Sequence, residues 1–414
     1  MISVDRDRLR ADIEANAEFG TVESDAGRGR TVLTGSEADG QARERLVDRL
    51  EAAGLEVRVD PVGNVAGRWV PDGVSPDVAP IALGSHLDSV PRGGIFDGPL
   101  GVYAALEAVR AIQESATTPE RPLEVVSFTE EEGAQFGVGT LGSSVAADRL
   151  SVEEAHALTN DAGETLEERL EGIGFVGSDE VDPSTWNAWL EVHVEQDTKL
   201  ESAGIPIGVV NSISGITNCT ATVSGEANHA GATSMADRRD ALTAASEFVV
   251  DVERIAKGVT DDHPTAVATV GRQDVEPNVR NIVPGRVRME MDVRSVEADA
   301  IDAIVERSAE RLERLESERP VETSFDRHRD SPPVHLSDRC VDAIGRATDR
   351  LDVEATTMHS AAIHDTGNVA AMTDAAMLFA PSRDGVSHSP LEWTDWDDCA
   401  TSAAVLGAAA LELA

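Results

Sequence analysis

The chain has 414 residues, too many for one hydrophobic core, and its 41% hydrophobic content is that of a globular protein, so two domains are expected. A formal net charge of −41, from 76 acidic against 35 basic side chains, argues against nucleic acid or an anionic membrane surface as partner. The N-terminal residues contain no apolar targeting segment and no apolar run is long enough to span a bilayer, which predicts a soluble, cytoplasmic protein.

Lysine and cysteine are both scarce. Arginine supplies almost all of the positive charge, because Lys199 and Lys257 are the only lysines. An acidic, lysine-poor surface suits a cytoplasm at high salt, where charges are screened, and predicts a halophilic protein. The three cysteines, Cys219, Cys340 and Cys399, form no C-x-x-C pair, so neither a disulfide framework nor a thiolate metal site is expected.

Apolar, β-rich runs alternate with helical stretches through the first half of the chain. This alternation predicts an α/β domain with a mixed, largely parallel sheet flanked by helices. The clearest helix begins at Pro99. The clearest strands are IALGSH (81–86), LEVVSFT (123–129), AWLEVHVE (188–195) and, near the end of the chain, AAMLFAP (375–381).

A different pattern occupies residues 214–328. Its elements follow the order β-α-β-β-α-β, with helices over roughly 236–257 and 297–316, which is the ferredoxin-like arrangement. Because α/β patterning resumes after RDSPPVH, this α+β domain is predicted to be inserted into the first. The expected domains are therefore residues 1–213 and 329–414 together, and residues 214–328 alone.

Metal-ligand residue types follow four of the predicted strands, where open α/β sheets bind ligands. His86 ends the first strand, Asp88 follows it, and Asp97 precedes the next helix. An imidazole and a carboxylate suit Zn²⁺ or a similar ion, with Asp88 placed to orient the His86 ring. Asp97 before Gly-Pro is also typical of a helix N-terminus, so both interpretations stay open.

Three consecutive carboxylates, Glu130, Glu131 and Glu132, follow the second strand. In an ideal strand Glu130 and Glu132 point one way and Glu131 the other, but a twist or bulge could bring two of them toward one cleft. One could then ligate a metal ion while its neighbour acts as general base on water that the metal activates. The alternative is a solvated acidic turn.

Four further histidines are candidates only in combination. His193 lies near the end of the third strand and His388 follows the fourth after a glycine-containing turn, while His229 and His364 lie in segments rich in small residues. Taken alone, each is better explained as a packed, hydrogen-bonded or surface histidine.

Seven motifs in chain order resemble those of the amidase/hydantoinase/carbamoylase family. That family belongs to the dinuclear zinc-peptidase clan, which includes aminoacylases and carboxypeptidases. The motifs are GSHLDSVPRGGIFDGPLGV, FTEEEGAQF, EVHVEQ, GEANHAGATSMADRRDAL, PNVRNIVPG, MDVRS and PSRDGVSHSPLEWT. Two N-terminal segments, FG (19–20) and AGLEVRVDPVGNVAGR (53–68), extend the resemblance over nearly the whole chain.

The resemblance implies a catalytic domain with two divalent ions, Zn²⁺ or else Mn²⁺, Co²⁺ or Ni²⁺, and an inserted lid domain that forms a homodimer. Asp97 would bridge the two ions, and Glu131 would be the general base that moves a proton from water to the leaving nitrogen. The implied metal ligands are His86, Asp97 and His193 for one ion, and Asp97, Glu132 and His388 for the other.

The resemblance also implies substrate-binding residues. His229 of a partner subunit's lid would stabilise the oxyanion, and Asn278 and Arg294 on the lid would bind a substrate carboxylate. Gln196 and His364 would contact the amide or ureido end of the substrate. Closure of the lid would bring these groups together.

The chain departs from the family pattern at three places. Ala361, Ala362 and Ile363 replace the usual Gly-Ala-Gly before His364, Gln135 stands where arginine is common after the glutamates, and Arg280 interrupts the usual small apolar residue between Asn278 and Asn281. These departures concern the substrate more than the metal ions, since every implied metal ligand is present.

The predicted function is a metal-dependent amidohydrolase that cleaves the C–N bond of N-carbamoyl-L-amino acids or related ureido acids. Within the same class, the alternatives are hydrolysis of allantoate and an aminoacylase or dipeptidase activity on N-acyl amino acids. A rival of another class is a non-catalytic, dimeric metal-binding protein. Glu131 argues against this rival, because a structural metal site has no need of a base.

Overall fold

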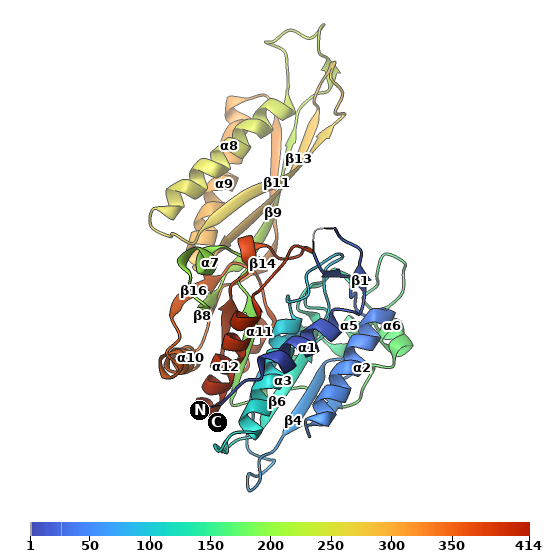
Figure 1. Cartoon of the computed structure of the whole chain (residues 1–414). Helices are drawn as coiled ribbons and strands as arrows, with labels where there is room; N and C mark the ends of the chain where they lie inside the picture. Colours follow the sequence, from blue (N-terminus) through green and yellow to red (C-terminus); the bar gives the residue numbers. More distant parts are fainter. Residues whose placement is uncertain (1, 26) are drawn as a thin grey trace. The chain divides into compact units, whose positions relative to one another are not determined.

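The computed structural model of the chain describes residues 2–25 and 27–414, which divide into two compact units (Figure 1). The first unit runs to Asn211 and resumes over Leu336–Met358 and His364–Ala414, and the second comprises Ser212–His335 and His359–Ile363. The sequence predicts domain boundaries between residues 213 and 214 and between residues 328 and 329. In the structure the second unit runs on beyond residue 328 because its last strand, β14, extends to Ser331.

The larger sheet has nine strands in the order β15-β8-β17-β7-β5-β6-β4-β3, with β16 paired to β8. Its four central strands are parallel, as predicted: β5 (Ile81–His86), β6 (Leu123–Phe128), β7 (Ala188–Val194) and β17 (Ala375–Ala380). The outer strands are β3 (Glu56–Val59), β4 (Val65–Trp69), β8 (Ile207–Ile213), β15 (Val334–His335) and β16 (Ala355–Ser360). The central strands read as unbroken apolar runs because a parallel sheet is covered on both faces.

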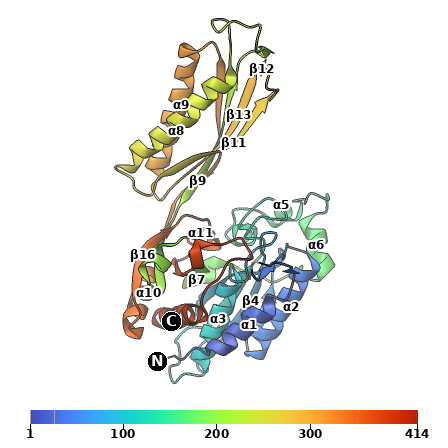
Figure 2. The ribbon, with the colours of Figure 1, turned by 45° about the horizontal axis from the view of Figure 1, so that its top comes forward.

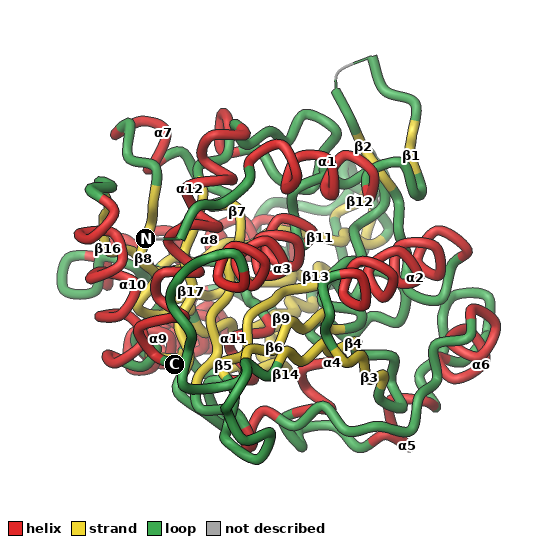
Figure 3. Tube along the Cα trace, turned by 60° about the horizontal axis from the view of Figure 1, so that its bottom comes forward, coloured by secondary structure: helices red, strands yellow, loops and turns green. Residues whose placement is uncertain are grey.

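Helix α3 (Pro99–Gln113) packs against the central strands β5, β6 and β7 (Figure 3). Every residue from Pro99 to Ile112 is buried, as expected of a helix that is apolar on most sides. Gly101 permits the close packing, since a Cβ there would lie 2.4 Å from the carbonyl oxygen of Val192. The helix therefore begins directly beside the ends of β5 and β7.

The other elements of the first unit surround this layer. Helix α12 contacts α3, β7 and β17, and α1 contacts α3. The longer helices are α1 (Arg6–Asn16), α2 (Glu37–Ala52), α10 (Asp338–Leu351) and α12 (Trp396–Leu413). The short elements are β1 (Thr21–Val22), β2 (Gly29–Arg30), α4 (Leu141–Ala146), α5 (Val152–His156), α6 (Leu166–Ile173), η1 (Pro183–Thr185), α7 (Lys199–Ala203), α11 (Asp365–Val369) and η2 (Arg383–Gly385).

The second unit is an antiparallel sheet in the order β11-β13-β9-β14 with α8 and α9 packed on it (Figure 2). The predicted β-α-β-β-α-β order is confirmed. Its elements are β9 (Gly215–Ser224), α8 (Ala241–Thr260), β11 (Val267–Glu276), β13 (Arg286–Ser295), α9 (Ala298–Glu318) and β14 (Glu322–Ser331), with a short ladder of β10 (Asn228–His229) and β12 (Ile282–Val283). In residues 2–25 and 27–414, no helix has the length and apolarity that crossing a membrane requires.

Candidate metal centre

The parallel strands bring their carboxyl ends to one edge of the larger sheet, and candidate ligands lie there. His86 is the last residue of β5, and His193 is the last but one of β7. The three glutamates follow β6, and His388 follows β17. The direction of the strands thus explains why these segments meet at one edge of the sheet.

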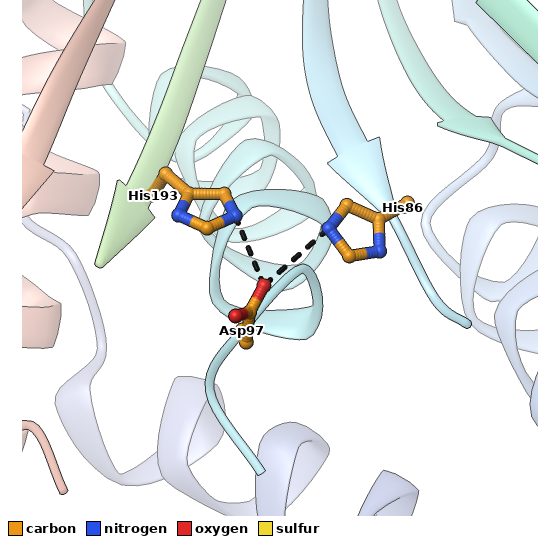
Figure 4. Close-up of side chains that lie close together, drawn as sticks. All are labelled: His86, Asp97 and His193. Carbon is orange, nitrogen blue, oxygen red and sulfur yellow. Dashed lines mark ion pairs between the residues drawn. The ribbon is translucent and has the colours of Figure 1, made fainter. Parts of the chain in front are cut away.

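Asp97 lies between the two strand-end histidines (Figure 4). Its Oδ1 is 3.1 Å from His193 Nε2 and 3.5 Å from His86 Nε2, and all three side chains are buried. Gly98 makes this approach possible, because it has a φ of +80° and a Cβ at this position would lie 2.5 Å from the His86 ring. His86, Asp97 and His193 together could hold one metal ion and are called the first ligand group.

The second ligand group uses the other oxygen of Asp97. Oδ2 lies 3.4 Å from His388 Nε2, and the same nitrogen is 3.3 Å from Glu132 Oε2. Asp97, Glu132 and His388 place their ligand atoms close enough to share one ion. The single carboxylate of Asp97 therefore belongs to both groups, one oxygen to each.

The three consecutive glutamates do not alternate as they would in a strand. Strand β6 ends at Phe128, and Glu130 has a left-handed backbone with a φ of +54°. Glu130 is buried, whereas Glu131 Oε2 lies 3.7 Å from His86 Nε2 and Glu132 faces His388. The turn after the strand thus sends both later glutamates to the ligand groups.

Asp88 connects the first strand end to this turn. Its two carboxylate oxygens accept the backbone N–H groups of Glu131 and Glu132, each at 3.1 Å. The His86 Nδ1 atom lies 3.2 Å from the Asp88 carbonyl oxygen and 3.5 Å from its carboxylate. Asp88 therefore contacts both His86, the ring that the sequence predicts it to orient, and the turn that carries the glutamates.

The electrostatics of the two groups fit divalent cations. Among the described residues none forms a hydrogen bond with the buried His86 Nε2 atom, which points at Asp97. Burial raises the pKa of Glu132 to about 7, and the hydrogen bond to Asp97 raises the pKa of His388 to about 9. Buried carboxylates are costly unless they are paired or coordinate a metal, and imidazoles with carboxylates are a suitable donor set.

The other predicted residues of the first unit adjoin this centre. Gln196, with a φ of +59°, donates from Nε2 to Asp97 Oδ2 at 3.1 Å and to Ser387 Oγ at 3.4 Å. His364 is buried, and its ring packs edge-on against His193 with ring centroids 4.5 Å apart. The predicted contact of both residues with substrate stays a prediction.

His229, Asn278 and Arg294 lie on the second unit. The His229 Nδ1 atom accepts the backbone N–H groups of Gly231 and Ala232 at 3.1 and 3.0 Å. Because Nδ1 is an acceptor, the proton of the neutral ring is on Nε2, where it can be donated. Asn278 has a left-handed backbone with a φ of +53°.

Two residues that support Asp97 were not identified from the sequence. The Glu392 carboxylate accepts the backbone N–H of Asp97 at 3.0 Å, and Ser387 Oγ lies 2.6 Å from Asp97 Oδ2. Both lie in the motif PSRDGVSHSPLEWT, in which the sequence pattern indicates only His388. The only feature of the sequence that could have indicated Glu392 is the composition of this motif, in which it lies four residues after His388.

A third cluster of ligand types lies on the second unit and does not resemble the first two. It consists of His263, Glu297 and Asp299, all at least partly exposed. His263 Nδ1 forms an ion pair with Glu297, the N-cap residue of α9. This contact accounts for the cluster as a surface ion pair.

The fold and the two ligand groups that share Asp97 define a hydrolase built to hold metal ions. Residues 82–412 match Peptidase family M20/M25/M40, and the chain belongs to this family, in its hydantoinase/carbamoylase amidase subgroup. The family implies a dinuclear metal site. Its members in this subgroup are hydrolases of carbon–nitrogen bonds other than peptide bonds, and so is this protein.

Known relatives cover almost the entire chain. An N-carbamoyl-L-amino acid amidohydrolase of Geobacillus stearothermophilus is 37% identical over 393 residues, which are 94% of each chain. An allantoate amidohydrolase of Bacillus subtilis (strain 168) is 33% identical over 386 residues, or 92% of this chain and 91% of the relative. The crystal structure of a hydantoinase/carbamoylase family amidase from Burkholderia multivorans has a TM-score of 0.93 at 34% identity and covers 100% of this chain and 98% of that one.

Proposed function

We propose that this protein hydrolyses N-carbamoyl-L-amino acids or closely related ureido acids. The observation that supports this most directly is the position of Asp97, whose two carboxylate oxygens face different histidine groups with Glu131 beside them. The names of the relatives supply the substrate class, an N-carbamoyl amino acid or a ureido acid. The products from an N-carbamoyl amino acid would be the amino acid, ammonia and carbon dioxide.

Two divalent ions would be held by the two ligand groups, where they would polarise the substrate carbonyl and lower the pKa of water. Of the residues around them, Glu131 is the proposed base, because it lies within the cluster without belonging to either ligand group. Burial raises the pKa of Glu131 well above the usual glutamate range, which suits a group that takes a proton from water and gives it to the leaving nitrogen.

The second unit would supply substrate recognition. His229 of the partner subunit, with its donor hydrogen on Nε2, would stabilise the oxyanion, and Asn278 and Arg294 would bind the carboxylate of the substrate. Asp292 accepts hydrogen bonds from Nε and Nη2 of Arg294, at 2.8 and 3.2 Å, and the Ala361 carbonyl accepts one from Nη1 at 2.9 Å. These bonds use three of the five N–H donors of the guanidinium, which leaves two for a substrate.

Three further features belong to the proposal. The ions would be Zn²⁺, Mn²⁺, Co²⁺ or Ni²⁺, since histidine and carboxylate ligands suit each of them. The second unit would act as a lid and join two copies of the chain into a homodimer. The net charge of −41 would adapt the protein to high salt.

A substrate panel tests the proposal. Purified protein would be loaded with each of the four metals at high salt and incubated with N-carbamoyl-L-amino acids, allantoate and N-acetyl amino acids. Ammonia release is measured for the first two classes and the freed amino group for the third. We expect turnover of the carbamoyl or ureido compounds, whereas N-acetyl substrates alone would indicate an aminoacylase. No turnover by fully metallated protein would leave the non-catalytic metal-binding protein as the better interpretation.

A further inference from the structure

Glu130 has no part in the proposed chemistry although it is the first of three consecutive glutamates. It is fully buried, with 0% of its surface exposed, and neither ligand group includes it. A buried carboxylate must find hydrogen-bond donors, because an unpartnered one is costly. Its partners therefore indicate what it does.

The Glu130 side chain closes the loop that follows it. Its Oε1 atom accepts the backbone N–H groups of Gln135 at 2.7 Å and Phe136 at 2.8 Å. The Thr34 side chain also lies beside the carboxylate, but among the described residues none forms a hydrogen bond with Oε2. One side chain thus ties the start of the glutamate loop to its far end, five and six residues on.

The backbone of Glu130 decides where the next two side chains go. With a φ of +54°, Glu130 ends the alternation of the strand, and the N–H groups of Glu131 and Glu132 then turn to the same acceptor, Asp88. Successive N–H groups converge on one anion in this way when a left-handed residue is part of the turn. Without this turn, Glu131 and Glu132 would point in opposite directions.

We propose that Glu130 is a positioning residue, which holds the loop of residues 130–136 so that Glu131 and Glu132 both face the metal centre. The part of this inference that concerns Glu131 rests on the proposed function. The part that concerns Glu132 rests on metal binding alone. The left-handed turn and the two hydrogen bonds from Gln135 and Phe136 are the observations that support it.

The segment should still fold when the side chain is removed, although its turn is then held less firmly. The carbonyl oxygens of Glu130 and Glu131 accept the N–H groups of Leu141 and Thr140, at 3.2 and 2.7 Å, and these bonds do not involve the Glu130 carboxylate. Glu130→Ala is therefore expected to fold with a loosened loop. Glu130→Gln keeps one carbonyl oxygen, which is enough for both N–H groups because the same Glu130 oxygen accepts both.

The test compares these two variants with a matched control. Asp5 also accepts two backbone N–H groups with one oxygen, both at 3.0 Å, but at the start of α1. For Glu130→Ala we expect kcat to fall about 100-fold with KM changed by less than about threefold, because misplaced groups lose rate more than binding. Glu130→Gln should restore kcat to within about threefold, and Asp5→Ala should lower the melting temperature while leaving kcat unchanged.

Metal titration separates this inference from the proposed function. Calorimetry of the metal-free proteins should show the ion at the Glu132 group bound about tenfold more weakly in Glu130→Ala than in the wild type, with the other ion unaffected. This result needs no substrate, so it stands even if no panel compound is turned over. Wild-type metal affinity in Glu130→Ala would overturn the inference, as would equal losses of kcat in Glu130→Ala and Glu130→Gln. If Glu130→Ala does not fold, the shorter Glu130→Asp takes its place with the same expected losses.

Discussion

Glu392 accepts the backbone N–H of Asp97 at 3.0 Å, although 295 positions separate the two residues in the chain. The same Glu392 oxygen accepts the N–H of Phe96 at 2.9 Å, and Ser387 Oγ lies between the two carboxylates, 2.9 Å from Glu392 and 2.6 Å from Asp97. The residue that belongs to both ligand groups is therefore held at its backbone and at its side chain by one loop from the end of the chain.

Replacement of Glu392 by alanine should weaken metal binding. We expect the affinity for both ions to fall about 10- to 100-fold, the usual effect of losing a residue that orients a ligand, because Asp97 serves both groups. Equilibrium dialysis of the metal-free protein measures this. Glu107→Ala is the control: Glu107 is a fully buried carboxylate on α3 that binds Arg8 and lies outside both ligand groups. It should lower stability without changing metal affinity; an equal loss in both variants would contradict the prediction.

Glu131 and Glu132 should respond differently to substitution. Glu131→Gln removes the proposed base but no ligand, so both ions should stay bound while kcat falls at least about 100-fold. Glu132→Ala removes a member of the second ligand group only, so one ion per subunit should be lost. Metal content by elemental analysis and kcat on the best panel substrate distinguish the two. If Glu131→Gln kept near-normal turnover, the role proposed for it would be wrong.

Arg294→Lys should weaken substrate binding more than catalysis. The planar guanidinium of Arg294 binds Asp292 and Ala361 and still offers N–H donors to a carboxylate. The single ammonium group of a lysine cannot do both. We expect KM to rise about tenfold or more, which corresponds to about 1.4 kcal/mol, with a smaller change in kcat. Arg288→Lys on the same strand is the control, since Arg288 is exposed and paired with Glu290. A KM that Arg294→Lys leaves unchanged would remove Arg294 from the substrate site.

The strands that carry the candidate ligands could be predicted because the pattern that indicates each strand lies within its own residues. Strands β5, β6, β7 and β17 are buried on both faces, so each appears as an unbroken apolar run, and parallel pairing places their ends at one edge. The start of helix α8 is harder to predict. Its sequence pattern starts near residue 236, but the helix begins only after Asp240, the N-cap residue, which accepts the N–H of Thr243. Such ends depend on one side-chain hydrogen bond.

The parts of the centre that could not be predicted depend on contacts between distant segments. The alternation rule places Glu130 and Glu132 on one side, but the turn at Glu130 is held by Asp88 from another strand end and by Phe136. Glu392 likewise shows no local sign that it binds Asp97. A sequence pattern therefore identifies which residue types are suitable, whereas the tertiary structure decides which carboxylate faces a metal and which holds the backbone.

Metal affinity should rise with pH because of His388. In the metal-free protein the hydrogen bond to Asp97 raises the pKa of His388 to about 9, above its ordinary 6.5. That protonated contact stabilises the metal-free fold fully below pH 6.5, and its contribution is lost as the pH rises through 9. A metal ion needs the neutral imidazole, so affinity at this group should increase by about tenfold per pH unit from pH 7 toward 9.

The pH effect can be measured by competition with a chelator at several pH values, corrected for the chelator's own protonation. His156→Asn is the control: His156 bonds the Pro61 carbonyl and belongs to neither ligand group, so the slope should be unchanged. An affinity that stays flat between pH 7 and 9 in the wild type would show that no proton leaves His388 when the ion binds.

Removal of salt should destabilise the protein. A net charge of −41 produces repulsion between carboxylates across the surface, and the Debye length grows from about 10 Å at 0.1 M salt to about 30 Å at 0.01 M, so more of these pairs repel one another as salt is removed. We expect the melting temperature to fall steadily as KCl is lowered from molar to millimolar concentration, and the yield of refolding to fall with it. Glycerol at matched osmolality serves as the control, because a neutral solute does not screen charge and should not restore the melting temperature. Full stability and refolding without salt would mean that the arginine ion pairs, such as Arg110 with Asp12, already balance the acidic surface.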